Sequence, residues 1–179
     1  MTLLIPTDRL DIRPFVPGDL DGLYAMYGDP TTMSFVGDGR PASREQTARA
    51  LLEAIEDHDD TNPGLLACVE RSTGELVGRG GFKAWTVEDE DETEIGWMVA
   101  SRNQSRGFAT EMGAALRDHA FQVLELDHVI SVIQPGNVAS IRVAEKVGER
   151  YWREWVTPGG QEVVLYRVDV GNPRAPVHA

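Results

Sequence analysis

The sequence has little cysteine, little lysine and no long apolar run. Its single cysteine, Cys68, excludes a disulfide-stabilised scaffold and is expected to pack inside a strand as a small hydrophobic residue. No segment approaches the roughly 20 apolar residues of a membrane-spanning helix. The sequence also has no His-Glu-x-x-His motif, no cysteine pair and no Gly-x-Ser-x-Gly motif. The sequence thus offers no motif of this kind for a metal site or for a cysteine intermediate, and neither is expected.

The charge balance is strongly acidic. The chain has 29 Asp and Glu residues against 17 Lys and Arg, a formal net charge of −12, and only Lys83 and Lys146 are lysines. Because binding to a nucleic-acid backbone needs clustered basic residues, this balance argues against nucleic acid and favours a cationic partner. Residues 1–6 lack the basic start and long apolar run of a signal peptide, so a cytoplasmic location is expected, with no membrane partner.

The length of 179 residues and the even composition predict one domain, residues 1–170, followed by a flexible tail, residues 171–179. Hydrophobic periodicity predicts an α/β (α+β) fold in which antiparallel hairpins surround one β-α-β crossover at residues 94–133. The expected strands are 10–13, 65–69, 76–85, 94–99, 128–133, 151–156 and 163–168, and the expected helices are 20–27, 44–56, 109–123 and 138–147.

The segment from Gln104 to Glu111 joins a predicted strand to a predicted helix. The free N–H groups at a helix start form an anion site together with the helix dipole, and Gly107 allows a phosphate to approach the backbone. Arg102 and Arg106 add positive charge to the same loop. The segment predicts a pyrophosphate cradle, and the alternative is an ordinary helix start that needs a glycine for its geometry.

A second segment, Asn137 to Gly148, follows the next predicted strand. Asn137 can cap the helix, as can Ser140 one turn further on, and Gly148 is a natural C-terminal stop. Taken by itself, Asn137 is equally well explained as a helix cap.

Together these two segments resemble the GNAT superfamily of N-acetyltransferases. Gln104, Gly107 and Ala109 match the family's Gln/Arg-x-x-Gly-x-Gly/Ala acetyl-CoA motif. Residues 137–148 match the Asn-x-x-Ser-x-x-x-x-Glu-Lys-x-Gly pattern of a subgroup that resembles ribosomal-protein N-terminal (alanine/serine) acetyltransferases. Residues 7–14 and 94–97 also look like that subgroup. The sequence departs from the pattern at Glu149, where relatives usually carry an aromatic residue.

The resemblance implies a mixed, mostly antiparallel sheet with a splayed parallel strand pair, flanked by about four helices. Strands 94–99 and 128–133 would separate to admit the pantetheine arm of the cosubstrate, acetyl-CoA. The implied binding groups are the main chain of Met98 and Val99, the loop and helix start at Gln104, Ser105, Arg106, Gly107, Phe108, Ala109 and Thr110, and the side chain of Asn137.

The implied activity is transfer of an acetyl group to a primary amine by direct attack with general-base assistance. An α-amine has a pKa of about 7.7–8.0 and a lysine amine about 10.4, so deprotonating the lysine costs roughly 3 kcal/mol more. A protein or peptide N-terminus is therefore the favoured acceptor. The alternatives are a small-molecule acetyltransferase for an amino sugar, polyamine or toxin, and a non-catalytic acyl-CoA-binding sensor.

The resemblance also suggests which residues assist catalysis. Glu94 is expected to be the general base because it begins the strand that should carry the thioester, and Glu92 or a water molecule is the alternative. Ser140 is expected to donate to the leaving thiolate, with Tyr151 as the alternative. The acidic run from Glu88 to Glu92 is expected in a loop near the acceptor mouth, where it either attracts a cationic acceptor or is simply solvated. A homodimer is compatible with the exposed hairpins.

Overall fold

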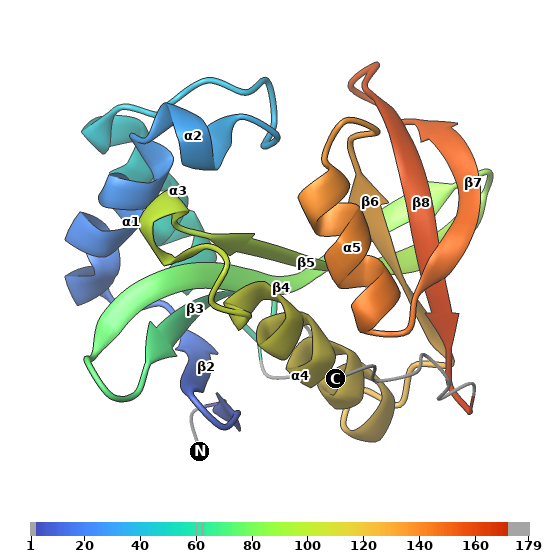
Figure 1. Cartoon of the computed structure of the whole chain (residues 1–179), viewed down its shortest axis with the longest axis horizontal. Helices are drawn as coiled ribbons and strands as arrows, with labels where there is room; N and C mark the ends of the chain where they lie inside the picture. Colours follow the sequence, from blue (N-terminus) through green and yellow to red (C-terminus); the bar gives the residue numbers. More distant parts are fainter. Residues whose placement is uncertain (1–2, 60, 62, 172–179) are drawn as a thin grey trace.

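A mixed sheet of eight strands organises the protein in the computed structural model, which describes residues 3–59, 61 and 63–171 (Figure 1). The strand order is β1-β2-β3-β4-β5-β6-β8-β7, with β5 and β6 parallel and the other described pairs antiparallel. This confirms the expected fold class and the β-α-β crossover. The strands are β1 (Ile5–Pro6), β2 (Leu10–Pro14), β3 (Leu65–Glu70), β4 (Glu75–Val87), β5 (Glu90–Val99), β6 (His128–Ile133), β7 (Arg150–Val156) and β8 (Glu162–Asp169). The α-helices are α1 (Leu20–Tyr27), α2 (Pro30–Met33), α3 (Arg44–Glu56), α4 (Phe108–Gln122) and α5 (Val138–Lys146).

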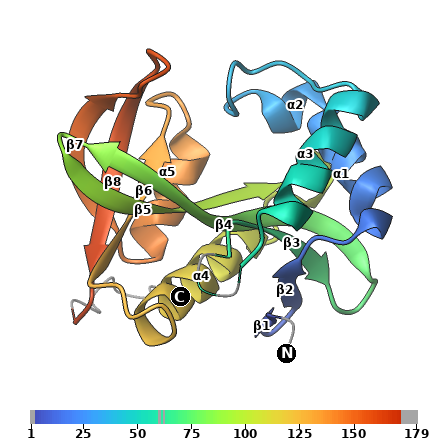
Figure 2. The same ribbon diagram turned by 180° about the vertical axis from the view of Figure 1, so that it is seen from behind.

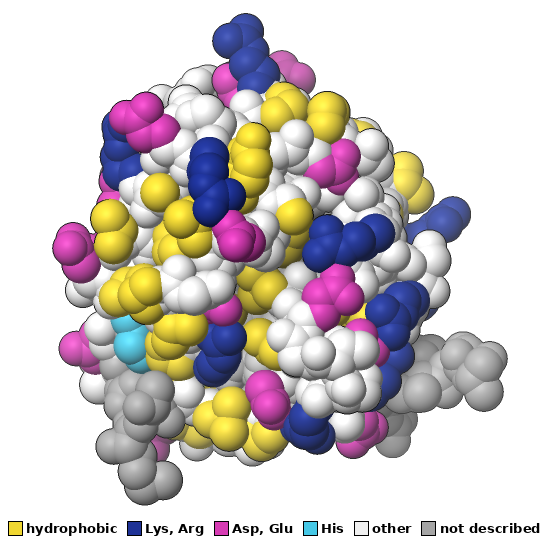
Figure 3. Space-filling model, turned by 90° about the vertical axis from the view of Figure 1, so that its left-hand side faces the viewer, with side chains coloured by type: hydrophobic (Ala, Val, Ile, Leu, Met, Phe, Trp, Pro, Cys, Tyr) yellow, Lys and Arg dark blue, Asp and Glu magenta, His cyan; other side chains and the backbone are white. Residues whose placement is uncertain are grey.

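Helices cover both faces of the sheet in its N-terminal half (Figures 1 and 2). On one face, α1 and α3 bury Leu23 and Leu51 in a cluster that also contains Met98 of β5. On the other face, Met112 and Leu116 of α4 pack over the middle of the sheet. Charged side chains of both signs alternate with hydrophobic ones on the outer surface over the N-terminal helices (Figure 3).

Local sequence signals explain where the helices begin and how closely they pack. The Ser43 hydroxyl accepts from the Gln46 N–H at 3.2 Å, and Gln46 Oε1 accepts from the Ser43 N–H at 2.7 Å, which completes the predicted capping box of α3. A Cβ added at Gly80 would lie 2.6 Å from Met112 Sδ. The glycine therefore allows α4 to lie directly against β4.

The C-terminal half of the sheet curls around a separate cluster. The end of the β4–β5 hairpin lies behind β8 and β7 in Figure 1 and in front of them in Figure 2. There the Trp85 and Trp155 rings meet edge to face at 5.4 Å, next to Ile130 and Leu165. This packing holds the end of the β4–β5 hairpin against β6, β7 and β8.

The acidic segment 88–92 is not a loop, so that prediction is wrong. Glu88 and Asp89 alone form the β4–β5 turn, and both have positive φ (50° and 69°), as a two-residue type I′ turn requires. Glu90 already begins β5. Glu92 is buried, with its Oε2 2.6 Å from Nε2 of His128 and its Oε1 3.7 Å from the Arg167 guanidinium. These partners offset the desolvation cost that would otherwise exclude a carboxylate from the sheet interior.

Two short elements, β1 and α2, were not predicted, because neither is long enough to show a periodicity. The predicted flexible tail, residues 171–179, lies outside the described residues except for Gly171. No helix in the described part of the chain is long and apolar enough to cross a membrane.

Candidate active site

Strands β5 and β6 pair over a very short distance and then separate. Along the whole of these two strands, the parallel register consists of one pair, Glu94 opposite Ile130. Beyond it β5 and β6 diverge, whereas β5 stays paired with β4 from residue 90 to residue 99 (Figure 1). We call the point after Glu94 and Ile130 the fork. The predicted splayed pair is therefore a feature of the fold.

The β4–β5 pairing determines which main-chain groups of β5 face away from β4 beyond the fork. The Ala100 N–H donates to the Val77 carbonyl, and the direction of main-chain groups alternates along an antiparallel pair. The N–H and C=O of Ile95, Trp97 and Val99 therefore point away from β4, toward the side of β6. Those of Met98 point toward β4, and its side chain is buried among the N-terminal helices. The main chain of Trp97 is a further candidate binding group that was not among the predicted ones.

The loop after β5 leads to the start of α4 with its backbone exposed. Gly107 is the N-cap residue, with φ +84°, and the first helical bond runs from the Glu111 N–H to the Gly107 carbonyl at 3.1 Å. The N–H groups of Phe108, Ala109 and Thr110 therefore have no partner within the helix. Gln104 Nε2 donates to the Val99 carbonyl at 3.3 Å, which ties this loop to the edge of β5.

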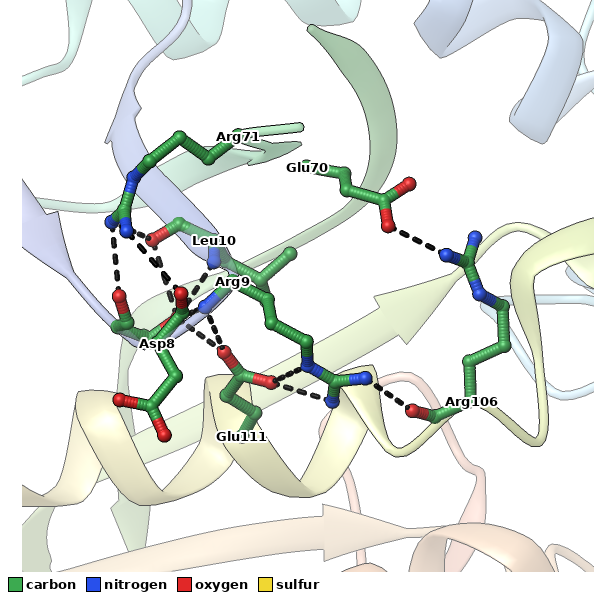
Figure 4. A network of polar contacts seen from close by, with 8 residues as sticks. Asp8, Arg9, Leu10, Glu70, Arg71, Arg106 and Glu111 are labelled. Carbon is green, nitrogen blue, oxygen red and sulfur yellow. Dashed lines mark hydrogen bonds and ion pairs between the residues drawn. The ribbon is translucent and has the colours of Figure 1, made fainter. Parts of the chain in front are cut away.

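Two arginines flank the helix start, one from the loop and one from the distant β1–β2 turn (Figure 4). The guanidinium groups of Arg9 and Arg106 lie 4.7 and 4.5 Å from the centroid of the Phe108 ring. Arg9 also donates to the Arg106 carbonyl at 2.9 Å. Sequence reasoning did not assign Arg9 to the site, although the motif at residues 7–14 marked its segment.

Carboxylates balance the arginines around this loop. Glu111 pairs with Arg9 at 2.6 Å, Glu70 with Arg106 at 2.5 Å, and Glu75 with Arg102 at 2.8 Å. Side-chain charge alone therefore does not make the loop an anion site, and the unpaired N–H groups at the helix start are the stronger attraction for an anion.

Gly107 leaves the space that such an anion requires. A Cβ added there would lie 3.3 Å from Arg9 Nη2, and the positive φ disfavours any other residue. A diphosphate group fits this arrangement of free N–H groups, a missing side chain and a guanidinium. The pantetheine arm of coenzyme A fits the exposed edge of β5 that begins at the fork.

Glu94 lies at the fork on the face opposite α4. Its side chain is half-buried, and Oε2 accepts from the indole N–H of Trp85 at 2.6 Å. Desolvation raises the pKa of Glu94. The Trp85 hydrogen bond and the positive charge of Lys83, its partner across the β4–β5 pair, oppose that shift. A carboxylate with a raised pKa suits a general base, because proton transfer is most efficient when the pKa of the base is closer to neutral pH.

The other predicted residues lie in different surroundings. Asn137 Oδ1 accepts from the Ser140 N–H at 3.1 Å, so Asn137 caps α5, and Ser140 lies half-buried in the first turn. Tyr151 is exposed on β7 with its ring against Tyr166. Glu92 pairs with His128 rather than facing solvent. Within the described part of the chain, no group of three or more His, Cys, Asp and Glu side chains is arranged to hold a metal ion.

The loop between α2 and α3 reaches across to the C-terminal half on the side of the molecule away from α4. The Gly37 carbonyl accepts hydrogen bonds from the amides of Gln134 and Gln161. The loop after β6 and the β7–β8 hairpin thus contact the loop between α2 and α3.

Comparison with known proteins gives a consistent family assignment. The family model "Acetyltransferase (GNAT) domain" matches residues 9–150. The Bacillus subtilis protein YkkB, described as uncharacterized, is 30% identical over 156 residues, covering 85% of this chain and 90% of YkkB. YnaD of the same organism, an uncharacterized N-acetyltransferase, is 29% identical and covers 82% of each chain.

Solved structures share the fold. A GNAT-family acetyltransferase from Bacillus anthracis superposes with a TM-score of 0.80 at 23% identity, covering 93% of this chain and 98% of that one. RimL, a ribosomal L7/L12 α-N-protein acetyltransferase solved with coenzyme A, gives 0.74 at 16% identity over 94% and 98%. AAC(6')-Ib solved with ribostamycin and coenzyme A gives 0.74 at 18% identity over 91% and 94%.

Proposed function

The chain belongs to the GNAT acetyltransferase family and is an acyltransferase, and from this premise we propose that it transfers the acetyl group of acetyl-CoA to the α-amine of a protein or peptide. One observation carries the proposal. The fork exposes one edge of β5 between the free helix start at Gly107 and the Glu94 carboxylate. A thioester bound along that edge would lie between an anion site and a base.

Binding of acetyl-CoA uses mainly main-chain groups in this proposal. The N–H groups of Phe108, Ala109 and Thr110 hold the diphosphate, and Ser105 and Arg106 shape the approach to it. Val99 and Trp97 offer main-chain groups to the pantetheine arm. Asn137 keeps its capping bond while its amide N–H groups face the same arm. Met98 was expected to offer main-chain groups to the same arm. Because these groups point toward β4, Met98 contributes little to binding in this proposal.

The chemistry requires a neutral amine, a base and a proton donor. Acetyl-CoA supplies the thioester. The amine nitrogen forms a bond to the acetyl carbon while the C–S bond breaks, and the proton lost by nitrogen passes to the Glu94 carboxylate. Ser140 Oγ donates to the leaving thiolate, which regains its proton from solvent. N–H groups of β5 beyond the fork stabilise the negative charge that develops on the carbonyl oxygen.

The acceptor is a weakly basic, cationic amine. At neutral pH roughly a tenth of an α-amine is already neutral, against well under a thousandth of a lysine amine. The acidic balance of the chain, a formal net charge of −12, favours an acceptor with further positive charge. The structural likeness to RimL supports a protein N-terminus, and the likeness to AAC(6')-Ib supports the alternative of a small-molecule amine.

The experiment uses the full chain with acetyl-CoA and a panel of acceptors. The panel contains peptides with free N-termini, the same peptides with blocked N-termini and internal lysine, polyamines and aminoglycosides. Release of free thiol measures turnover, and mass spectrometry locates the acetyl group. Acetylation of free peptide N-termini supports the proposal. Turnover with small amines alone identifies the second candidate, and acetyl-CoA binding without turnover on any amine identifies a sensor.

A further inference from the structure

Past the fork, the next main-chain hydrogen bond of the parallel β5–β6 pair is missing. Its acceptor and its donor each interact with a polar side chain instead. In a parallel pair with this register, the Ile95 carbonyl would accept from the Val132 N–H. Instead, the Ile95 carbonyl accepts from the Ser131 hydroxyl at 3.0 Å. The Val132 N–H interacts with the Glu94 carboxylate. Each half of the missing bond therefore has a polar side chain as its partner.

The Ser131 hydroxyl also contacts the side chain of a buried glutamate. Glu149 is 2% exposed, and its Oε1 lies 2.9 Å from Ser131 Oγ. The backbone explains why it turns inward. Gly148, with φ +98°, ends α5 in a Schellman motif, in which the Glu149 N–H donates to the Ala144 carbonyl at 2.9 Å and the Gly148 N–H donates to the Glu145 carbonyl at 3.2 Å.

One hydroxyl hydrogen cannot serve both oxygens that surround it. If Ser131 donates to the Ile95 carbonyl, the contact with Glu149 is a hydrogen bond only when Glu149 carries a proton and donates it. The surroundings favour that state: desolvation raises the pKa of Glu149 to about 8. The nearby charge of Glu94 also raises it. The positive charge of Arg117 of α4 opposes the shift, as does the Ser131 hydroxyl whenever it donates to the carboxylate instead of to Ile95. A neutral acid also lowers the cost of leaving the buried Oε2 without a partner.

We propose that Ser131 and Glu149 form a staple that holds the Ile95 carbonyl and thereby fixes the point at which β5 and β6 separate. Glu149 is then a positioning residue for the acetyl-CoA groove, acting through Ser131, and this inference rests on the proposed function. Without the staple, the Ile95 carbonyl loses its partner and can accept from the Val132 N–H, which then exchanges the Glu94 carboxylate for a main-chain acceptor. That pairing extends the parallel ladder and closes the part of the β5 edge nearest the fork.

Four variants of the full chain test the staple. Glu149→Met keeps the side-chain length but removes the donor, Ser131→Ala removes the bridge, the double variant removes both, and Glu149→Gln keeps a neutral donor. Calorimetry measures the Kd for acetyl-CoA, and steady-state kinetics gives its KM and kcat. Glu149→Met and Ser131→Ala are each expected to raise Kd and KM about five- to tenfold, the equivalent of one neutral hydrogen bond, with a smaller change in kcat. The double variant should match the single ones.

Glu149→Gln provides the rescue and the pH control. It should bind acetyl-CoA close to wild-type affinity at pH 7, because an amide N–H can replace the acid as donor. Above about pH 8 the wild type should bind more weakly as Glu149 loses its proton, and Glu149→Gln should lack that limb. Glu94 and Arg117, the charged groups facing Glu149 from β5 and α4, remain in both proteins.

Several results would overturn the staple. They are equal acetyl-CoA affinity in all four variants, additive losses in the double variant, or a Glu149→Gln variant as impaired as Glu149→Met. Thermal unfolding identifies any variant that does not fold. If Glu149→Met does not fold, the acetyl-CoA affinities of Ser131→Ala and Glu149→Gln are compared instead: a loss in the first and none in the second supports the staple, and any other result refutes it. Unchanged variants beside a wild type that binds acetyl-CoA refute the staple alone. A wild type that does not bind acetyl-CoA refutes the proposed function as well.

Discussion

The indole N–H of Trp85 lies 2.6 Å from Oε2 of Glu94, and the two residues come from adjacent strands at the fork. This bond holds the carboxylate in one orientation. It also favours the charged form, so it limits how far desolvation raises the pKa of Glu94. The pair therefore orients the proposed base and favours the charged form that accepts a proton.

Removing the base should slow the chemical step. Glu94→Gln keeps the size of the side chain and can still accept from Trp85, but it cannot take a proton. We expect kcat to fall by about 10²–10⁴, with little change in the Kd for acetyl-CoA. The matched control is Glu92→Gln, which disturbs the buried pair with His128 and should lower the melting temperature more than kcat. The reverse pattern would make Glu92 the base.

Removing the indole donor should move the pH profile. Trp85→Phe deletes a hydrogen bond that stabilises the Glu94 carboxylate, so the pKa of Glu94 should rise further. The acidic limb of kcat/KM should shift to higher pH by about one unit, which corresponds to a hydrogen bond to a charged group. A profile that stays in place while activity falls would mean that Trp85 has a packing role only.

A side chain at Gly107 should obstruct the cosubstrate. Gly107→Ala places a methyl group beside Arg9 in the space proposed for the diphosphate and forces alanine into a positive φ. The Kd for acetyl-CoA should rise about tenfold or more, since more than one hydrogen bond to the helix start is lost. Gly64→Ala is the control, because Gly64 also has a positive φ (+61°) but open space around it. Equal affinity in the two variants would exclude the loop as the binding site.

The buried acid should make stability depend on pH in a defined direction. The pKa of Glu149 is about 8 in the native state against 4.5 as the ordinary value. Between these values the native state keeps a proton that the unfolded chain has lost, so stability falls as pH rises through this window. Glu149→Gln has no such proton. Its melting temperature relative to wild type should therefore increase from pH 5 to pH 9, and a constant difference would show that Glu149 is not protonated in the folded protein.

Sequence patterns predicted the parts of the fold that depend on neighbouring residues. The Ser43–Gln46 capping box, the helix start at Gly107 and the crossover from residue 94 to residue 133 all follow from local signals, and the structure contains each of them. The family resemblance added the separation of β5 and β6, which no local pattern encodes.

The errors and omissions concern contacts between distant segments. A run of acidic residues indicates a solvated loop, but Glu92 enters the sheet because His128 and Arg167 arrive from β6 and β8 to pair with it. The staple is of the same kind. Ser131 and Glu149 are separated by a helix, and only the fold brings them together behind the Ile95 carbonyl.

The most direct measurement is the mass of a short cationic peptide with a free N-terminus after incubation with acetyl-CoA and the wild-type chain, beside the Glu94→Gln variant. The wild type should add one acetyl group to the α-amine and release one thiol per transfer, while the variant should bind acetyl-CoA and produce little of either. Acetylation at equal rates by the two proteins, or no acetylation of any amine by the wild type, would contradict catalysis at the fork.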